Sequence, residues 1–424
     1  MRAFPLISIP KRIVYVDDKG SFLEALRKTL PRDHARQFID SPAGAIERLQ
    51  EEVVYWRDLE RMLNVMDAGS LDHPGIAKQL VSNYFNNYTR FHLTSVLIVD
   101  YAMPGINGLE VIEQLDNWPG RRILLTGEAD SRVAVNAFNR GLIQKFIPKT
   151  TRNLYRVLKA DYEEMHEVVC EQVGHLLRPS LTEEQKDVLH DATIVEGLKG
   201  MVEELEWSEY VVVGRPFGLL GLSHTGPLQW IQLETQNSLF SLTEMLQEEG
   251  VPANEVSLVR DGVMLSNMDI HHQLDLKGRI QLQETKLLGG ELPVYAAVFD
   301  LDVPVLTSKS YGIDDIMTPI EEVRSMVRDL LQSYQLRSTS QDSEWNLLSD
   351  DVVSPTLAPD LVNSYRAHER DIHSMSALLL RLGQTAGRSI LHRHALEQVL
   401  RERELPPDLA AHVEASVLIG KSIG

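Results

Sequence analysis

The sequence contains few of the residues that build disulfide-rich, zinc-binding or membrane-spanning proteins. Of its 424 residues only Cys170 is a cysteine, which excludes an intramolecular disulfide and a cysteine-based zinc site and fits a reducing compartment. No apolar run reaches the roughly 18–20 residues that cross a bilayer. The apolar part of the N-terminus is short and broken by Pro5 and Pro10, unlike a signal peptide. These absences predict a cytoplasmic protein that does not contact a membrane.

Basic residues are scarce relative to acidic ones. The chain has 42 Lys and Arg against 61 Asp and Glu, a formal net charge of −19. Such a protein repels nucleic acid unless its basic residues gather on one face. The basic run at residues 388–403 also contains glutamates, which favours an ordinary amphipathic helix over a DNA-binding one. The charge therefore argues against a nucleic-acid partner.

Short apolar, β-branched runs alternate with helical patterns in the first 150 residues. The expected strands are residues 12–17, 36–39, 94–100, 122–126 and 144–147. The expected helices lie at or begin in residues 21–30, 43–50, 108–115 and 131–139. This alternation is typical of a parallel sheet covered by helices on both faces, so we expect an α/β, doubly wound domain.

Residues 51–91 interrupt this alternation. They contain two helical patterns separated by the turn-rich DAGSLDHPG, which predicts a helical hairpin inserted between the second helix and the third strand. Its aromatic side chains either form a surface for a partner or pack against the parent sheet, and packing is favoured. These residues are Tyr55, Trp56, Tyr84, Phe85 and Tyr88.

The rest of the chain is expected to form further regions. Residues 151–178 read as the last helix of the first domain, 1–178, continuing into a connector. Residues 179–337 read as an α+β domain of unknown role, with strands expected at 210–213, 217–222, 228–233, 256–260, 279–283 and 294–299, and helices at 201–206, 238–248 and 319–335. Residues 338–359 are polar and acidic and predict a linker, and 360–424 predict a helical C-terminal region.

Polar residues stand at the carboxyl ends of the expected strands. They are Asp17, Asp18, Asp100, Thr126 and Lys149, and they should meet at one edge because the strands are parallel. Several carboxylates in one pocket repel each other, which implies a hard divalent cation, most naturally Mg²⁺. A carboxylate can also attack phosphorus, and a lysine and a hydroxyl suit the neutralisation of a phosphoryl group.

Four motifs carry a family resemblance. VDD at residues 16–18, DYAMPGINGLE at 100–110, LLTGEAD at 124–130 and FIPK at 146–149 resemble, in that order, the motifs of response regulator receiver domains. The resemblance covers residues 12–158 and implies a flavodoxin-like fold with a doubly wound, five-stranded parallel sheet. The sequence departs from the family pattern after Lys149, where Thr150 replaces the usual proline and Pro148 precedes the lysine.

The resemblance assigns roles to individual residues. It implies that Asp100 accepts a phosphoryl group from a sensor histidine kinase or a phosphotransfer protein. Asp18 would bind Mg²⁺ directly, Asp17 through water, and the carbonyl of Ala102 would be a further metal contact. Thr126 would donate a hydrogen bond to the phosphoryl group, Lys149 would pair with it, and Phe146 would turn inward as Thr126 moves.

The C-terminal half has no recognisable effector motif. It contains no phosphate-binding loop, zinc spacing, cyclic-dinucleotide signature or clear helix-turn-helix. Two functions stay open: a signalling protein whose output is protein–protein contact, including a homodimer, or a response regulator with an unrecognised DNA-binding or enzymatic effector. The acidic charge favours the first. No enzymatic activity is expected beyond the receiver's own phosphorylation and dephosphorylation.

Overall fold

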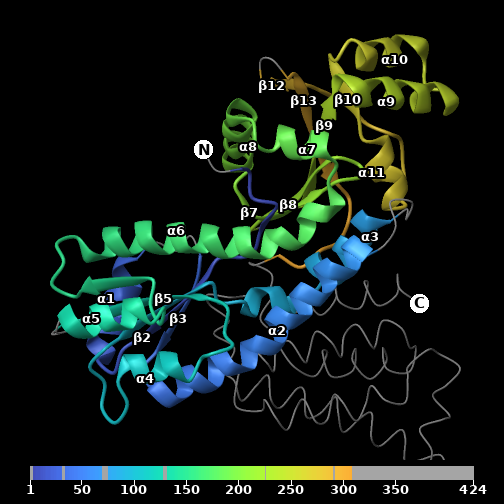
Figure 1. Ribbon diagram of the computed structural model, residues 1–424. Coiled ribbons are helices and arrows are strands. Elements are labelled where there is room, and N and C mark those ends of the chain that lie inside the picture. The colour runs from blue at the N-terminus through green and yellow to red at the C-terminus, as the bar shows by residue number, and fades with distance from the viewer. Residues whose placement is uncertain are drawn as a thin grey trace, which may run out of the picture. The chain divides into compact units, whose positions relative to one another are not determined.

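The computed structural model describes residues 3–307, except 31–33, 69–74, 128–130, 225 and 290–291 (Figure 1). Met1–Thr307 form one compact unit. The expected helix at 319–335, linker at 338–359 and helical region at 360–424 lie outside the described residues. Within the described part, none of the helices combines the length and the apolar character that crossing a membrane requires.

The first half of this unit is built on a five-stranded parallel sheet. Its strands are β2 (Arg12–Val16), β3 (Ala35–Ile39), β4 (Val96–Asp100), β5 (Arg121–Thr126) and β6 (Lys145–Pro148). Their order in the sheet is β3-β2-β4-β5-β6. Every residue of β2 and β4 is buried, as expected of central strands covered on both faces. The expected flavodoxin-like, doubly wound receiver fold is confirmed.

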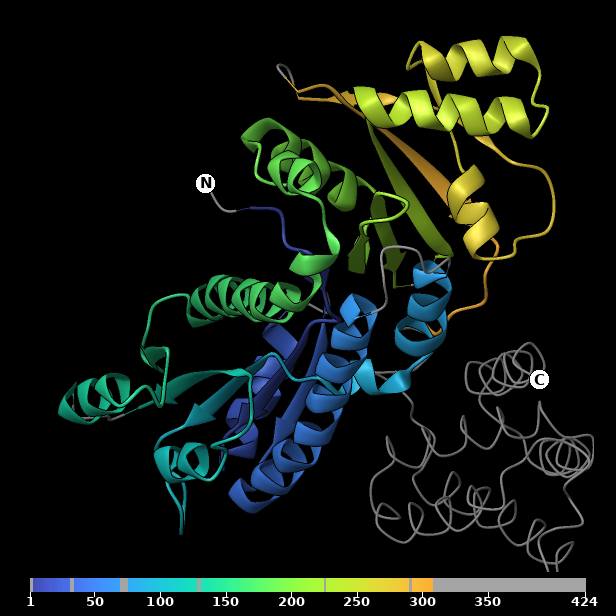
Figure 2. The same cartoon turned by 45° about the vertical axis from the view of Figure 1, so that its right-hand side comes forward.

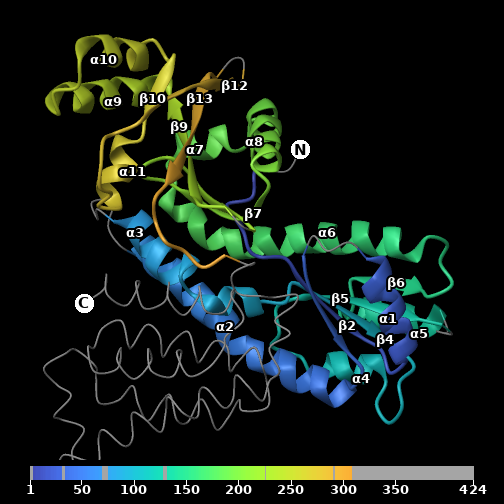
Figure 3. The same ribbon diagram turned by 180° about the vertical axis from the view of Figure 1, so that it is seen from behind.

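Helices cover both faces of this sheet (Figure 3). The helices are α1 (Gly20–Thr29), α2 (Pro42–Ala68), α4 (Gly108–Glu113), α5 (Ser131–Asn139) and α6 (Leu154–Gly174). Ile13 and Tyr15 of β2 pack in one cluster with apolar residues of α1 and α6. Val14 and Val16, which point to the other face, pack with residues of α2, α4 and α5. The alternation of side chains along each strand thus separates two cores.

The segment expected to be an inserted hairpin is organised differently. Helix α2 runs without a break over 27 residues, so the expected boundary at Glu51 is wrong: no glycine or proline follows Gly44 within α2 to end the helix. The second part consists of α3 (Ile76–Leu80), a π-helical turn at Val81–Phe85 and a 3₁₀ turn at Tyr88–His92. Trp56, Tyr84 and Phe85 are buried, which confirms that they pack in the interior.

The second half is built on a six-stranded antiparallel sheet of order β1-β7-β8-β9-β13-β12. Its strands are β1 (Ile7–Ser8), β7 (Trp207–Val213), β8 (Gly218–Ser223), β9 (Leu228–Thr235), β12 (Lys286–Leu288) and β13 (Val294–Leu301). A separate hairpin pairs β10 (Met264–Ser266) with β11 (Leu282–Glu284). The expected α+β character of this region agrees with this arrangement.

Helices accompany the second sheet. They are a 3₁₀ helix at His175–Ser180, α7 (Glu183–Val188), α8 (Ala192–Glu204), α9 (Gln236–Glu248), α10 (Ala253–Arg260) and α11 (Met268–Gln273). Figure 2 shows α9 and α10 side by side. The strand expected at 256–260 is wrong, because these residues belong to α10. Val256 and Val259, three residues apart, are the buried pair, which is helical spacing.

The first strand of the chain connects the two halves. Although β1 precedes the parallel sheet in sequence and lies inside the region 1–178, it pairs with β7 of the second sheet. The end of α6 lies close to the residue before β1. A Cβ added at Gly174 would be in ordinary van der Waals contact with the Cβ of Leu6, at 3.4 Å. One hydrophobic cluster contains side chains from both sheets, including Val99 and Trp230.

A buried ion pair joins the inserted segment to the second sheet. The side chains of Arg90 and Glu209 are 2% and 1% exposed. Arg90 Nε donates to Glu209 Oε2 at 2.8 Å and Nη2 donates to Oε1 at 3.1 Å. The same guanidinium donates to the carbonyls of Asn87 and Leu306. These partners compensate the buried positive charge of Arg90, which would otherwise destabilise the fold.

Removing one partner of this pair should destabilise the unit strongly. Arg90→Met leaves the Glu209 carboxylate buried without its cation, so we expect the free energy of unfolding to fall by about 3–5 kcal/mol. The control Arg61→Met breaks an exposed pair with Asp58 and should cost about 0–1 kcal/mol. Urea unfolding of both variants measures the difference. Similar small losses in the two variants would contradict a structural role for Arg90.

Candidate functional site

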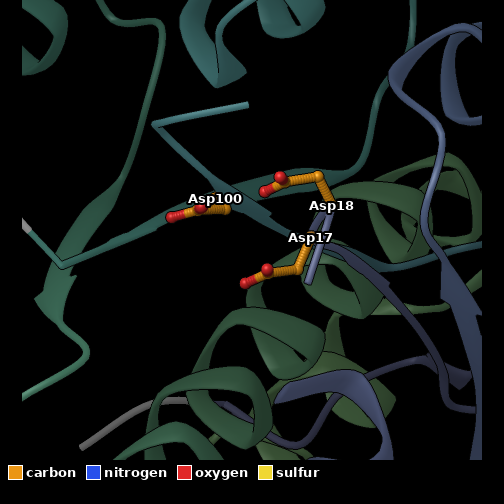
Figure 4. Close-up of side chains that lie close together, drawn as sticks. All are labelled: Asp17, Asp18 and Asp100. Atoms are coloured by element: carbon orange, nitrogen blue, oxygen red, sulfur yellow. The ribbon is translucent and has the colours of Figure 1, made fainter. Parts of the chain in front are cut away.

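Three carboxylates meet at the carboxyl edge of the parallel sheet (Figure 4). Asp17 and Asp18 directly follow β2, and Asp100 is the last residue of β4. The two strands are neighbours, with Val16 opposite Val99, so their ends lie together. Candidate ligand oxygens of the three residues lie within 4.8 Å of one another. The structure therefore brings together the acidic residues that the sequence pointed to.

Lys149 lies beside two of these carboxylates. Its Nζ is 2.5 Å from Asp17 Oδ2 and 3.0 Å from Asp100 Oδ2. The loop after β6 is fixed by a hydrogen bond from the Lys149 backbone N–H to the Thr126 carbonyl, at 2.7 Å. The ammonium also lies 4.6 Å from the centre of the Phe22 ring. The loop delivers the cation to the site even though Thr150, and not proline, follows it.

The other residues singled out from the sequence lie around this edge. Thr126 ends β5 and is buried, and β5 is the neighbour of β4, with Leu125 opposite Asp100. Phe146 lies on β6 opposite Leu124 and is partly buried. Ala102 is exposed in the loop two residues after Asp100. Their positions are compatible with the roles that the resemblance implies, and those roles remain predictions.

The electrostatics of Asp100 reflect this crowding. Burial is the largest cause that raises the pKa of its carboxyl group, and the nearby charge of Asp17 adds to it. The hydrogen bond and the charge of Lys149 act in the opposite direction but do not cancel the increase. Asp100 is thus a carboxylate that is held in an environment unfavourable to its charge.

The same environment fits a divalent cation. Asp18 Oδ1 and Asp100 Oδ1 are buried, and neither has a hydrogen-bond partner among the described residues. Buried carboxylate oxygens are normally bound by a donor or a cation. Oxygen ligands from carboxylates are what Mg²⁺ prefers. The unsatisfied oxygens and the close approach of three acids are therefore consistent with a Mg²⁺ site.

Three residues that were not assigned a role fix the start of α4 beside Asp100. Asn107 and Glu110 form a reciprocal cap at the start of α4, and Gly108 donates its N–H to the Tyr101 carbonyl at 3.0 Å. A Cβ on Gly108 would lie 2.1 Å from the carbonyl oxygen of Asp100, so only glycine permits this approach. The Asn-Gly pair followed by Glu at the start of an apolar helix was the available signal.

No family model matches the sequence, and no curated protein matches it. The response regulator LqsR of Legionella pneumophila matches with a TM-score of 0.56 and 20% identity, over 74% of this chain and 98% of that chain. The parallel sheet and its helices end at Gly174, so a likeness over 74% of the chain extends beyond them.

Shorter matches have lower scores. A CheY-like receiver domain protein of Methanospirillum hungatei JF-1 has a TM-score of 0.24 and 15% identity, over 38% of this chain and 98% of that chain. An adenylate cyclase of Rhodopirellula baltica has a TM-score of 0.27 and 22% identity, over 40% and 98%. The likeness to LqsR, together with the strand order, shows that the N-terminal half has the fold of response regulator receiver domains.

Neutralising Asp100 should stabilise the protein when no magnesium is bound. Asp100→Asn removes a buried charge whose pKa is raised in the folded state, so at neutral pH we expect Tm to rise by a few degrees. The gain should shrink as pH falls through the raised pKa of Asp100, because the wild-type carboxyl then becomes neutral too. Thermal unfolding in EDTA, at pH values that fall from about pH 7 to about pH 4, the ordinary range of an aspartate, measures it.

The control for this prediction is the exposed Asp116. Asp116→Asn should leave Tm and its pH dependence close to those of the wild type, since surface substitutions change stability little. A lower Tm for Asp100→Asn at neutral pH would mean that Lys149 more than offsets the cost of burying this charge.

Proposed function

We propose that this chain is a two-component response regulator in which Asp100 accepts a phosphoryl group. One observation carries the proposal: at the edge of a receiver fold, Asp100 lies among two further carboxylates and 3.0 Å from a lysine ammonium. A carboxylate can act as a nucleophile toward phosphorus. The cations around it offset the charge of the transferred group.

In the proposed reaction the phosphodonor is a phosphohistidine of a sensor histidine kinase or a phosphotransfer protein. A carboxylate oxygen of Asp100 attacks phosphorus, a P–O bond forms, and the P–N bond to the imidazole breaks, so that the donor recovers a neutral histidine after protonation. Lys149 pairs with the phosphoryl oxygens, and Thr126 donates its hydroxyl hydrogen bond to one of them. These groups position the phosphoryl group and neutralise its charge, which is the main requirement of such transfers.

The proposed metal is Mg²⁺. Asp18 and Asp100 would bind it directly, Asp17 would bind through water, and the Ala102 carbonyl would supply a further oxygen. When bound, the ion neutralises charge on the oxygens of the transferred phosphoryl group. The two buried oxygens of Asp18 and Asp100 that find no partner in the described part of the chain support this assignment. Lys149 already contacts Asp17 and Asp100, which keeps the acids together before an ion binds.

The proposed output is protein–protein contact in the cytoplasm, with a homodimer as one form of it. When Asp100 is phosphorylated, Thr126 and Phe146 would shift an existing equilibrium between an inactive and an active conformation of the β5–β6 edge. Val135 and Phe138 of α5, the helix between these strands, are 58% and 60% exposed. Large exposed apolar side chains on one helix favour a contact surface. The net charge of −19 argues against the alternative of a DNA-binding effector.

Asp100→Asn should abolish phosphorylation. An amide cannot form the acyl phosphate, so we expect labelling by acetyl phosphate or by a phosphorylated kinase to fall to background. The control Asp116→Asn changes an exposed aspartate of the same half and should be labelled like the wild type. Phosphate-affinity gels read both. Undiminished label on Asp100→Asn would refute the proposed phosphoacceptor.

Magnesium should stabilise the protein through the same residues. At about 100 times its Kd a ligand of the folded state adds about 2.7 kcal/mol to the free energy of unfolding, which MgCl₂ titration with thermal unfolding detects as a higher Tm. Asp18→Asn should lose most of this gain. Asp40→Asn, an exposed residue next to β3 at the same edge, should retain it. An equal gain in the wild type and in Asp18→Asn would show that the ion binds elsewhere.

A further inference from the structure

A cavity of about 260 Å³ lies outside the acidic site, where the parallel-sheet half leads into the second half. Three segments line it: residues 3–6, the end of α6 with the 3₁₀ helix that follows, and residues 181–190 around α7. Residues 3–6 lead into β1 of the second sheet, and the other two segments belong to the stretch of chain that runs from the parallel-sheet half to β7. None of the residues assigned to phosphorylation lines this cavity.

The interior of the cavity is apolar. Phe4, Leu181 and Leu189 line it and are themselves buried, and Pro5 and Leu6 add further apolar surface. The walls are held by backbone hydrogen bonds, of which Phe4 N–H to the Leu189 carbonyl, at 2.8 Å, closes the N-terminal segment onto the end of α7. A preformed cavity with apolar walls and a few polar groups is the usual form of a small-molecule site.

The polar groups at the cavity include two cationic side chains. Arg178 and Lys186 line it, together with the imidazoles of His175 and His190 and one carboxylate, Glu171. Lys186 is held at 2.8 Å by Glu183, and His190 Nδ1 donates to the Lys186 carbonyl at 2.5 Å, so both side chains are fixed in place. Arg178 makes no ion pair with the described residues. Since Lys186 is already paired with Glu183, the Arg178 guanidinium is the cationic group at the cavity that points to an anionic occupant.

We propose that this cavity binds a small amphipathic carboxylate, with its apolar part on Phe4, Leu181 and Leu189 and its carboxylate on Arg178. The volume of about 260 Å³ lies just below the usual range of ligand pockets and therefore suits a small molecule. Arginine presents paired donors that match a carboxylate. The ligand touches α6 and α7 together, so it would act on the connection between the two halves. This inference does not depend on phosphorylation of Asp100.

Three probes of equal chain length test the chemistry. Octanoate, 1-octanol and octylamine are titrated into the full-length protein, below their aggregation concentrations, by isothermal titration calorimetry. We expect saturable binding of one octanoate, about ten-fold weaker binding of 1-octanol and none of octylamine. Absence of saturable octanoate binding, or equal affinities for octanoate and 1-octanol, would overturn the proposal.

Two variants locate the binding. Arg178→Gln should weaken octanoate binding at least about ten-fold and leave 1-octanol binding unchanged, because only the carboxylate uses the guanidinium. Lys199→Gln, at an exposed position of α8 that does not line the cavity, should change neither. Arg178 is exposed, and circular dichroism checks that its variant folds. Octanoate affinity that is unchanged in Arg178→Gln would place the ligand elsewhere and refute the site.

Discussion

The close approach of three acidic side chains, Asp17, Asp18 and Asp100, is the constraint that governs the site at the edge of the parallel sheet. The register of β2 and β4 places these acids within 4.8 Å of one another. Burial and the charge of Asp17 both raise the pKa of Asp100. Lys149 relieves part of the repulsion through its contacts with two of the acids. The remaining free-energy cost of burying the Asp100 charge is a local instability of the kind found at functional sites, where a bound ligand can relieve it.

The rest of the fold holds this edge in place and ties it to the second sheet. Gly108 allows α4 to begin against the Asp100 carbonyl. The pair Arg90–Glu209 links the inserted segment to β7, and β1 adds the N-terminus of the chain to the same sheet. The second half is therefore bound to the first through a shared hydrophobic core and a buried ion pair.

Predictions from local sequence patterns were wrong where one pattern fits two different structures. Residues 256–260 contain three apolar side chains in five positions, which fits a short strand, but Val256 and Val259 are buried on one side of a helix. The start of the inserted segment could not be located from the sequence, because the residues on both sides of Gln50 belong to one continuous helix, α2. The pairing of β1 with β7 joins residues about two hundred positions apart, and two-residue strands carry little signal of their own.

The sequence by itself determined the parallel sheet and the position of Asp17, Asp100, Thr126 and Lys149 at, or directly after, the carboxyl ends of its strands. It could do so because buried strands are written as continuous apolar runs, and because parallel strands end at a common edge. Only the tertiary structure decided that Gly108 must lack a side chain, that Glu209 neutralises Arg90, and that three separate segments enclose an apolar cavity. These features arise from contacts between distant residues, which no local pattern encodes.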